Sequence, residues 1–209
     1  LTIMKKAFAL VALVAALFVA GNVQAQNMVY VGYTPETFTY SNSSANFQGI
    51  CAGFTKNINL AQGFGVAAGA QFRLNMRNAE ETFIGITGKN KETQALIDVP
   101  ILFNYGIAIN RDLTITPFIG PMISLGVIGK TQITENLFNT QHDYDWYGDS
   151  GVSYRPDNRF NLYGVFGANL RFSQFNLFGG YRLGLLDLKS SDDITLKANG
   201  FFIGLGYSF

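Results

Sequence analysis

Apolar residues alternate with small or polar residues along most of the chain after residue 27. In residues 200–209, one face of an extended strand carries Phe201, Ile203, Leu205, Tyr207 and Phe209, and the other carries Phe202, Gly204, Gly206 and Ser208. A period of two predicts a strand with a different environment on each face. The pattern predicts about eight strands, over residues 28–34, 47–58, 64–77, 97–107, 113–130, 160–172, 176–188 and 200–209.

The charged residues in these strands indicate which face meets which environment. Arg73, Asp98, Arg171 and Arg182 all lie opposite the bulky aliphatic side chains. A Lys or Arg facing lipid at mid-bilayer costs about 2–4 kcal/mol, so in a membrane the aliphatic face must point outward. In a soluble lipocalin-like barrel the aliphatic face would instead fill the interior. The Gly-rich second face and the apolar, aromatic final strand favour the membrane barrel.

The connections between the predicted strands alternate in length. Residues 59–62, 110–112 and 173–175 are expected to form tight turns, whereas 35–46, 78–92, 131–159 and 189–197 are expected to be long loops. We therefore predict an all-β, antiparallel, up-and-down transmembrane barrel with short periplasmic turns, long outer loops and both termini in the periplasm. Pro100, Pro117 and Pro121 are expected at bulges near strand ends or on the outer surface.

The first 25 residues have the composition of a secretory signal peptide. Lys5 and Lys6 precede an apolar run over residues 7–20, which is too short for a membrane span, and Val23 and Ala25 provide a small-residue cleavage site. We predict a signal peptide over residues 1–25 that is cleaved, and one barrel domain over residues 26–209. A retained anchor helix is the alternative.

Composition and charge narrow the function classes. The chain has 23 Gly, 19 Phe and 10 Tyr, and only 14% of its residues are charged. Removal of Lys5 and Lys6 leaves 13 basic against 14 acidic residues, so the mature chain has a net charge near −1. This balance gives no sign of nucleic-acid binding. Cys51 is the single cysteine, which excludes an intramolecular disulfide.

Polar side chains on the inner face predict a filled lumen, because an eight-stranded barrel is wide enough only for its own side chains. The predicted lumen cluster consists of Gln71, Arg73, Asp98, Asn104, Asn169, Arg171 and Arg182, together with Tyr163. In the structural interpretation the arginines and Asp98 neutralise one another, because buried charges are costly without partners. The functional alternative is a narrow ion path or a proton-sensing gate.

The longest predicted loop carries a candidate contact surface, made of His142, Tyr144, Trp146 and Tyr147. Aromatic residues of this kind are enriched in binding surfaces and in the girdles of membrane barrels. A solvated loop is the plain alternative, and a metal site at His142 is weakly indicated because its acidic neighbours lack a regular spacing. No nucleophile, base and carboxylate stand at a recognisable spacing, so we expect no enzyme activity, cofactor or metal.

The final strand resembles the closing strand of bacterial outer-membrane barrels. Gly204, Tyr207 and Phe209 match the signal that the barrel-assembly machinery reads, and Phe202 departs from it. With segments 97–105, 117–125 and 179–185, the mature chain resembles the small outer-membrane barrels common in Bacteroidetes, called porin-family or PorT-like. This resemblance implies the outer membrane of a Gram-negative bacterium, contact with its lipid, and, on the PorT branch, a secretion partner.

The leading hypothesis is a structural or interaction barrel that acts through its outer loops, chiefly residues 131–159. The alternatives are a PorT-like component of a protein-secretion apparatus, which requires an envelope partner, and a narrow ion channel.

Overall fold

The computed structural model of the chain describes residues 25–40, 43–83, 86–135, 140–147, 156–157, 159–189 and 195–209. These residues form eleven strands: β1 Ala25–Tyr33, β2 Glu36–Tyr40, β3 Ser43–Asn59, β4 Phe64–Phe83, β5 Ile86–Tyr105, β6 Ile107–Ala108, β7 Leu113–Glu135, β8 Thr140–Asp145, β9 Phe160–Phe172, β10 Phe175–Gly184 and β11 Leu196–Ser208. In this part of the chain, no helix is long and apolar enough to span a membrane. Residues 1–24 of the predicted signal peptide lie outside the described residues.

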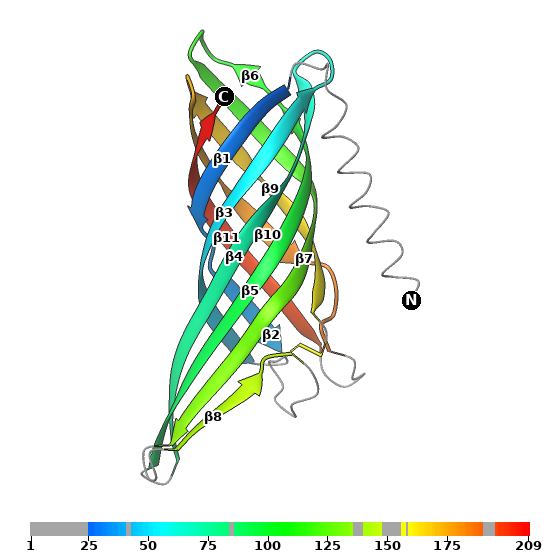
Figure 1. Ribbon diagram of the computed structural model, residues 1–209. Helices are drawn as coiled ribbons and strands as arrows, with labels where there is room; N and C mark the ends of the chain where they lie inside the picture. Colours follow the sequence, from blue (N-terminus) through cyan, green and yellow to red (C-terminus); the bar gives the residue numbers. More distant parts are fainter. Residues whose placement is uncertain are drawn as a thin grey trace.

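Eight of the strands close into a ring of antiparallel neighbours (Figure 1). The order around the ring is β1, β3, β4, β5, β7, β9, β10 and β11, and β1 pairs with both β3 and β11. Asn27 and Phe209 complete the closure, since each donates its backbone N–H to the other's carbonyl at 3.0–3.1 Å. A closed ring has no free edge. The predicted all-β up-and-down barrel of about eight strands is confirmed.

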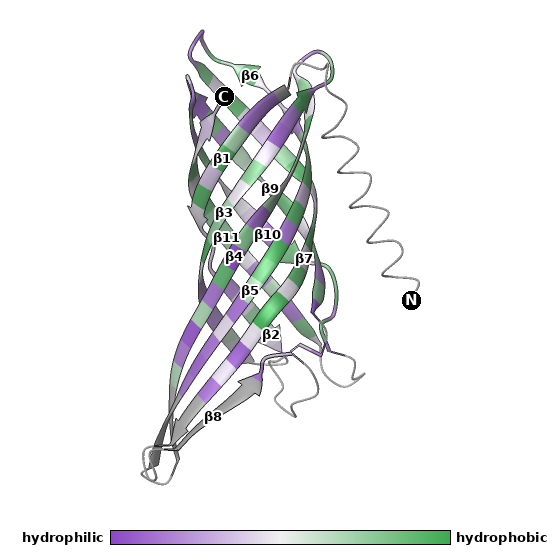
Figure 2. Ribbon diagram, in the orientation of Figure 1, coloured by the Kyte–Doolittle hydropathy of each residue, from purple (hydrophilic) through white to green (hydrophobic). Residues whose placement is uncertain are grey.

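The outer face of the barrel is apolar, as the charge pattern predicted. Val31, Ile119 and Leu205 are each more than half exposed, at 61%, 64% and 63%. Aromatic side chains gather where the strands meet the short turns, with Phe64 against Tyr105 and Phe175 against Tyr207 at ring-centroid distances of 4.8 and 5.7 Å. Figure 2 shows the hydrophobic residues along the barrel wall. An apolar band bordered by aromatic rings suits a lipid bilayer.

The two ends of the barrel differ in their connections. At one end, called here the short-turn end, residues 60–63, 109–112 and 173–174 link neighbouring strands. Gly63 at φ 88° and Ser173 at φ 54° allow the chain to reverse tightly. Ala25 and Phe209 lie at this same end (Figure 1). The opposite end, called here the long-loop end, carries the extensions of β4, β5 and β7.

Strands extend into three segments that the sequence pattern predicted as loops. β2 occupies part of 35–46, β4 and β5 occupy most of 78–92, and β7 and β8 occupy parts of 131–159. The prediction of loops in these segments is wrong. The alternation of apolar and polar residues ends where the lipid-facing band ends, whereas the backbone hydrogen bonds between the strands continue beyond that band. A strand with water on both faces shows no apolar period.

The prolines do not lie at bulges. Pro117 and Pro121 are exposed on the outer face of β7 and stay in register with β9, whereas Pro100 is buried on the inner face of β5. The register shift between β5 and β7 falls at Ala95 and Leu96 instead. The ladder is interrupted between the Pro100–Met122 and Phe103–Ile119 pairs, next to Pro121, which has no N–H to donate.

Candidate functional site

The interior of the barrel is divided along its axis into three successive regions. An apolar plug closes the long-loop end and includes Phe38, Phe47, Trp146, Leu188 and Leu196. A charged layer below it contains Arg73, Asp98, Glu36, Arg182 and Tyr163, all at 2% exposure or less. A cavity occupies the remaining part, toward the short-turn end.

Arg73 is the centre of the charged layer and is fully buried. Its Nη1 donates to Glu36 Oε2 at 2.7 Å, its Nε donates to Asp98 Oδ2 at 2.8 Å, and its Nη2 reaches Ser124 Oγ at 3.1 Å. Tyr163 donates its hydroxyl to Glu36 Oε1 at 2.5 Å. Charge-assisted hydrogen bonds of this kind compensate the desolvation of buried ions. The lumen at this level is therefore solid protein.

Arg182 lies in the same layer but hydrogen-bonds to no carboxylate among the described residues. Its Nη2 donates weakly to the backbone carbonyls of Thr34 and Pro35 at 3.4 and 3.5 Å. The Nε and Nη1 atoms are buried and have no hydrogen-bond partner. Its guanidinium carbon lies 5.8 Å from the ring centroid of Tyr163, within the range of a cation–π contact. Arg73 and Arg182 together balance the charges of Glu36 and Asp98, but of the two only Arg73 hydrogen-bonds these carboxylates. Two nitrogen atoms of Arg182 therefore stay without an acceptor among the described residues.

The members of the predicted lumen cluster are divided between two levels of the lumen. Gln71 joins the charged layer, since its amide donates to Asp98 Oδ2 at 2.7 Å. Asn104, Asn169 and Arg171 instead lie toward the short-turn end. Arg171 donates to neutral partners, Gln26 Oε1 at 2.5 Å and Thr114 Oγ1 at 3.3 Å. The expectation that the arginines and Asp98 neutralise one another therefore holds for Arg73, which pairs directly with Asp98, and in charge count for Arg182, because Glu36 supplies the second carboxylate of the layer. It does not describe Arg171.

Glu36, Asn75 and Ser124 belong to the charged layer and were not predicted. Asn75 donates its amide to Glu36 Oε2 at 2.7 Å, so Glu36 accepts hydrogen bonds from three side chains. The sequence reasoning missed Glu36 because Pro35 appeared to begin a loop. Asn75 and Ser124 do fall on the inner faces of predicted strands, and the alternation could have identified them.

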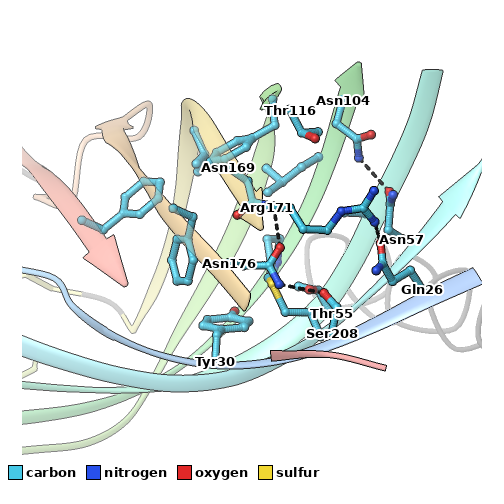
Figure 3. A pocket seen from close by; sticks show the side chains of 18 of the residues that line it. Gln26, Tyr30, Thr55, Asn57, Asn104, Thr116, Asn169, Arg171, Asn176 and Ser208 are labelled. Carbon is cyan, nitrogen blue, oxygen red and sulfur yellow. Dashed lines mark hydrogen bonds between the residues drawn. The ribbon is translucent and has the colours of Figure 1, made fainter. Parts of the chain in front are cut away.

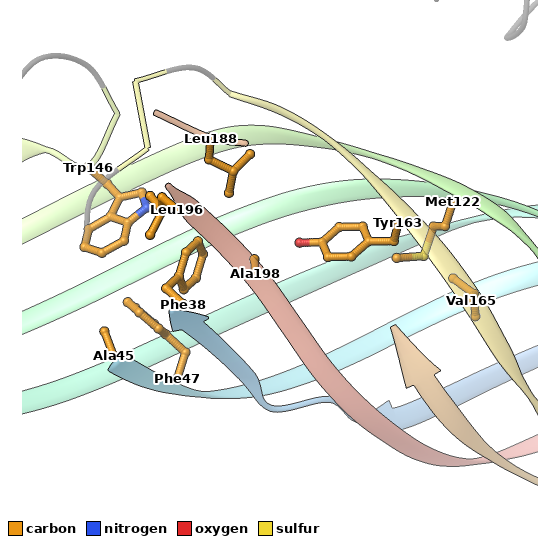
Figure 4. Packing of buried hydrophobic residues seen from close by; sticks show 10 residues of the cluster. All are labelled: Phe38, Ala45, Phe47, Met122, Trp146, Tyr163, Val165, Leu188, Leu196 and Ala198. Carbon is orange, nitrogen blue, oxygen red and sulfur yellow. The ribbon is translucent and has the colours of Figure 1, made fainter. Parts of the chain in front are cut away.

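The apolar plug corrects the prediction of an exposed contact surface. Trp146 is 0% exposed and packs edge-on against Phe47 and Phe38 at ring-centroid distances of 5.2 and 6.1 Å (Figure 4). Tyr147 is half-buried, with the guanidinium of Arg159 4.7 Å from its ring centroid. The reason is that the chain after β8 turns inward, and burial of these aromatic rings removes apolar area from water.

The other two members of that surface, His142 and Tyr144, belong to β8 by their backbone. Their side chains lie outside the described residues, so their part in a contact surface stays a prediction. Among the described residues, no group of three or more His, Cys, Asp or Glu side chains could hold a metal ion.

The cavity toward the short-turn end measures about 230 Å³. Figure 3 shows its amide-rich wall, where Asn104 donates to Asn57 at 2.8 Å, Asn169 to Asn176 at 2.9 Å and Asn176 to Ser208 at 2.8 Å. The apolar part of the lining comes from Met28, Leu102, Phe118, Met122, Val165, Phe178 and Phe202. Cys51, the single cysteine, also lines this cavity.

Four paired strands continue past the barrel at the long-loop end and form an extension, called here the projecting sheet (Figure 1). It consists of residues 77–83 of β4, 86–92 of β5, 130–135 of β7 and 140–145 of β8. β4 and β5 pair from Arg77 with Glu92 to Phe83 with Ile86, and β7 and β8 pair from Lys130 with Asp145 to Glu135 with Thr140. Figure 2 shows hydrophilic residues on the part of these strands nearest the barrel.

The closed antiparallel ring with an apolar outer face and a polar, filled interior defines a transmembrane β-barrel. Residues 16–190 match the family model described as outer membrane protein beta-barrel domain. The chain belongs to this family, and its place is the outer membrane. No curated protein matches the sequence.

Several solved structures are similar in architecture. Ail, the attachment invasion locus protein of Yersinia pestis, is 18% identical, with a TM-score of 0.45 over 90% of this chain and 100% of that chain. Neisserial surface protein A is 10% identical, with a TM-score of 0.46 over 88% and 97%. The N-terminal barrel of Pseudomonas aeruginosa OprF is 12% identical, with a TM-score of 0.34 over 89% and 100%.

Proposed function

We propose that this protein is a surface interaction barrel that binds an extracellular polypeptide along the edges of the projecting sheet. The observation that carries the proposal is the mismatch in strand length around the ring. β3 pairs with β4 only as far as Gln48 with Met76, whereas β4 continues with β5 to Phe83. Residues 78–83 therefore have no strand partner, among the described residues, on the side away from β5.

The other side of the projecting sheet has a second open edge. β8 pairs with β7, and no other described strand pairs with residues 140–145. Open edges present backbone N–H and C=O groups that can add a strand from another polypeptide. Natural proteins usually shorten or cover such edges. Two open strand edges, at residues 78–83 and 140–145, at the same end of a membrane barrel therefore favour a binding role.

The proposal includes an orientation. Short turns face the periplasm and long loops face outward in bacterial outer-membrane barrels. In this orientation the projecting sheet extends outside the cell, and Ala25 and Phe209 lie on the periplasmic side. The proposed binding of an extracellular polypeptide depends on this orientation, because a projecting sheet in the periplasm would meet periplasmic partners instead.

Two layers of packed side chains support a barrel that does not conduct. The apolar plug contains Trp146, Phe47 and Leu196, each at 0% exposure, and the charged layer below it contains Arg73 and Asp98, also at 0%. An ion crossing the lumen would have to displace both layers. A narrow channel and a PorT-like secretion component both stay predictions, and no described contact favours either over surface binding.

Site-specific photo-crosslinking in intact cells tests the proposal. A photoreactive residue replaces Asn78, which is exposed at the edge of the projecting sheet, and in a parallel strain it replaces Arg111, which is exposed in a short turn. We expect the residue at position 78 to form a discrete adduct with an extracellular polypeptide. The residue at position 111 should not form this adduct. Absence of any adduct at position 78 during growth under native conditions would contradict the proposal.

Two kinds of variant identify the edge as the contact. In the first, an Asn-Gly turn replaces residues 78–91, joining the directly paired Arg77 and Glu92 with a two-residue hairpin loop. In the second, paired prolines replace either Asn78 and Glu80 or Ala79 and Glu81. Backbone N–H groups alternate between the two sides of a strand, so one proline pair blocks the open edge while the other breaks the β4–β5 ladder.

The matched control replaces residues 190–194, between Lys189 and Thr195, with a Gly-Ser segment of equal length. These variants replace or remove position 78, so their readout is the amount of the polypeptide identified in the adduct that co-purifies with the barrel. We expect co-purification to be lost in the truncated variant and in the edge-blocking proline variant, and to persist in the control. Co-purification that survives truncation would show that the edge at residues 78–83 is not the binding surface. Heat-dependent mobility in gels verifies that each variant still forms a barrel.

A further inference from the structure

We propose that the cavity in the short-turn half of the lumen is a binding site for a small organic carboxylate, with Arg182 at its inner end and Arg171 at its mouth. The proposal does not depend on the projecting sheet, which lies at the opposite end of the molecule. It rests on the charge of the lining, on the unused hydrogen-bonding groups of Arg182, and on access from one end only.

The lining has a single sign of charge. Arg171 and Arg182 are its only charged members, and none of the described residues that line the cavity carries a carboxylate. The two carboxylates nearest in the fold, Glu36 and Asp98, are engaged by Arg73 in the charged layer. A concave site lined by cations alone concentrates anions, because low-dielectric walls focus the field.

Arg182 provides donors that the protein does not use. It is 2% exposed and lines the cavity, and its Nε and Nη1 atoms have no hydrogen-bond partner. A buried guanidinium group without acceptors is costly, and a carboxylate can accept from two guanidinium nitrogens at once. An anionic ligand would therefore complete the hydrogen bonding of the charged layer and stabilise the barrel.

The remaining lining suits an apolar body attached to the acid group. Phe178 contacts Tyr30 at a ring-centroid distance of 5.2 Å and Phe202 at 6.3 Å, which forms an aromatic wall. Met28 and Met122 add flexible thioether side chains to the lining. At about 230 Å³ the cavity admits a short aliphatic or aromatic acid and excludes a whole phospholipid.

The mouth of the cavity lies at the short-turn end. Arg171, Asn59, Gly63, Gly106 and Thr114 line both the cavity and a shallow depression on the rim beside the turn at residues 60–63. The other end is closed by the charged layer and the apolar plug. In the orientation proposed above, the ligand therefore enters from the periplasm.

Titration of the full chain in lipid nanodiscs with three probes tests the site. Hexanoate, hexanol and hexylammonium share an apolar tail and differ in the head group, and empty nanodiscs correct for partition into lipid. We expect saturable, one-to-one binding of hexanoate by isothermal titration calorimetry, and no saturable binding of hexanol or hexylammonium. Equal binding of hexanol, or no binding of hexanoate at millimolar concentration, would overturn the proposal.

Variants locate the bound acid. Arg182→Gln is expected to weaken hexanoate binding about tenfold or more, because it removes a charge-assisted hydrogen bond. Arg171→Gln is expected to weaken it less and serves as a second variant if Arg182→Gln fails to fold. The control is Arg111→Gln, which removes the same charge from an exposed turn at the same end.

Unchanged binding in both Arg182→Gln and Arg171→Gln would refute the assignment. Competition with phosphate and chloride distinguishes the source of the anion. Displacement of hexanoate by either ion at equal concentration would show a general anion site. That result would overturn the proposal that the ligand is an organic carboxylate.

Discussion

Replacement of Arg73 by leucine is the most informative perturbation of the lumen. Arg73 makes four hydrogen bonds in the charged layer: Nη1 to Glu36 at 2.7 Å, Nε and Nη2 to the two oxygens of Asp98 at 2.8 and 3.2 Å, and Nη2 to Ser124 at 3.1 Å. The side chains of all three charged residues are 0% exposed. Arg73→Leu leaves two buried carboxylates with Arg182 as the remaining cation of the layer, and the hydrogen bonds of Arg182 go to backbone carbonyls instead.

The expected cost follows from the burial of the pair. Removal of one partner from a buried ion pair costs about 3–5 kcal/mol of unfolding free energy, because the remaining charge stays buried and uncompensated. Here two carboxylates lose the same partner, so we expect a loss at the upper end of that range. Asn75 and Tyr163 still donate to Glu36, whereas Asp98 retains the neutral partners Gln71 and Ser124.

Denaturant unfolding in lipid vesicles measures this loss. Trp146 is the single tryptophan of the chain and is fully buried in the apolar plug, so its fluorescence reports exposure of the lumen. The control combines Arg73→Leu with Asp98→Asn, which leaves Glu36 and Arg182 as the charged residues of the layer. Their charges balance, so this variant should recover part of the stability. A loss below about 1 kcal/mol for Arg73→Leu, or no recovery in the double variant, would refute the reasoning.

Three further perturbations test other parts of the barrel. Trp146→Ala opens a void in the apolar plug and should cost about 3–5 kcal/mol in thermal or denaturant unfolding. Gly167→Ala should cost about 1–3 kcal/mol by overpacking, because its Cβ would lie 2.2 Å from a backbone oxygen of β10, whereas Gly164→Ala, with its nearest atom at 3.7 Å, should fold normally. Leu205→Arg places a cation in the lipid-facing band and should cost about 2–4 kcal/mol in vesicles, with a much smaller effect in detergent.

The barrel itself could be predicted from the sequence because two environments alternate along every strand. Lipid requires apolar side chains outside, and Arg73, Asp98 and Arg182 then have to face inward. β9, at Phe160–Phe172, begins and ends at the predicted residues, since turn residues flank an unbroken alternation. The ring closure between β1 and β11 follows, because an open apolar edge is not tolerated in a bilayer.

The projecting sheet and the division of the lumen could not be predicted. Residues 78–83 and 86–92 pair along their backbones in water, and backbone pairing leaves no apolar period in the sequence. The return of Trp146 into the barrel depends on contacts with β2 and β3, which lie far away in the sequence. Whether Arg73 or Arg182 engages the carboxylates depends on rotamers and strand stagger, which the alternation does not specify.

Cysteine labelling from outside intact cells tests the central claim, that this barrel spans the outer membrane with its projecting sheet outside. In a Cys51→Ser background, Asn78→Cys and Arg111→Cys place single thiols at exposed positions at opposite ends of the barrel. We predict that a membrane-impermeant maleimide labels the thiol at position 78 in intact cells and the thiol at position 111 only after the outer membrane is opened. Labelling at position 111 and protection at position 78 would contradict the orientation and the proposed binding surface.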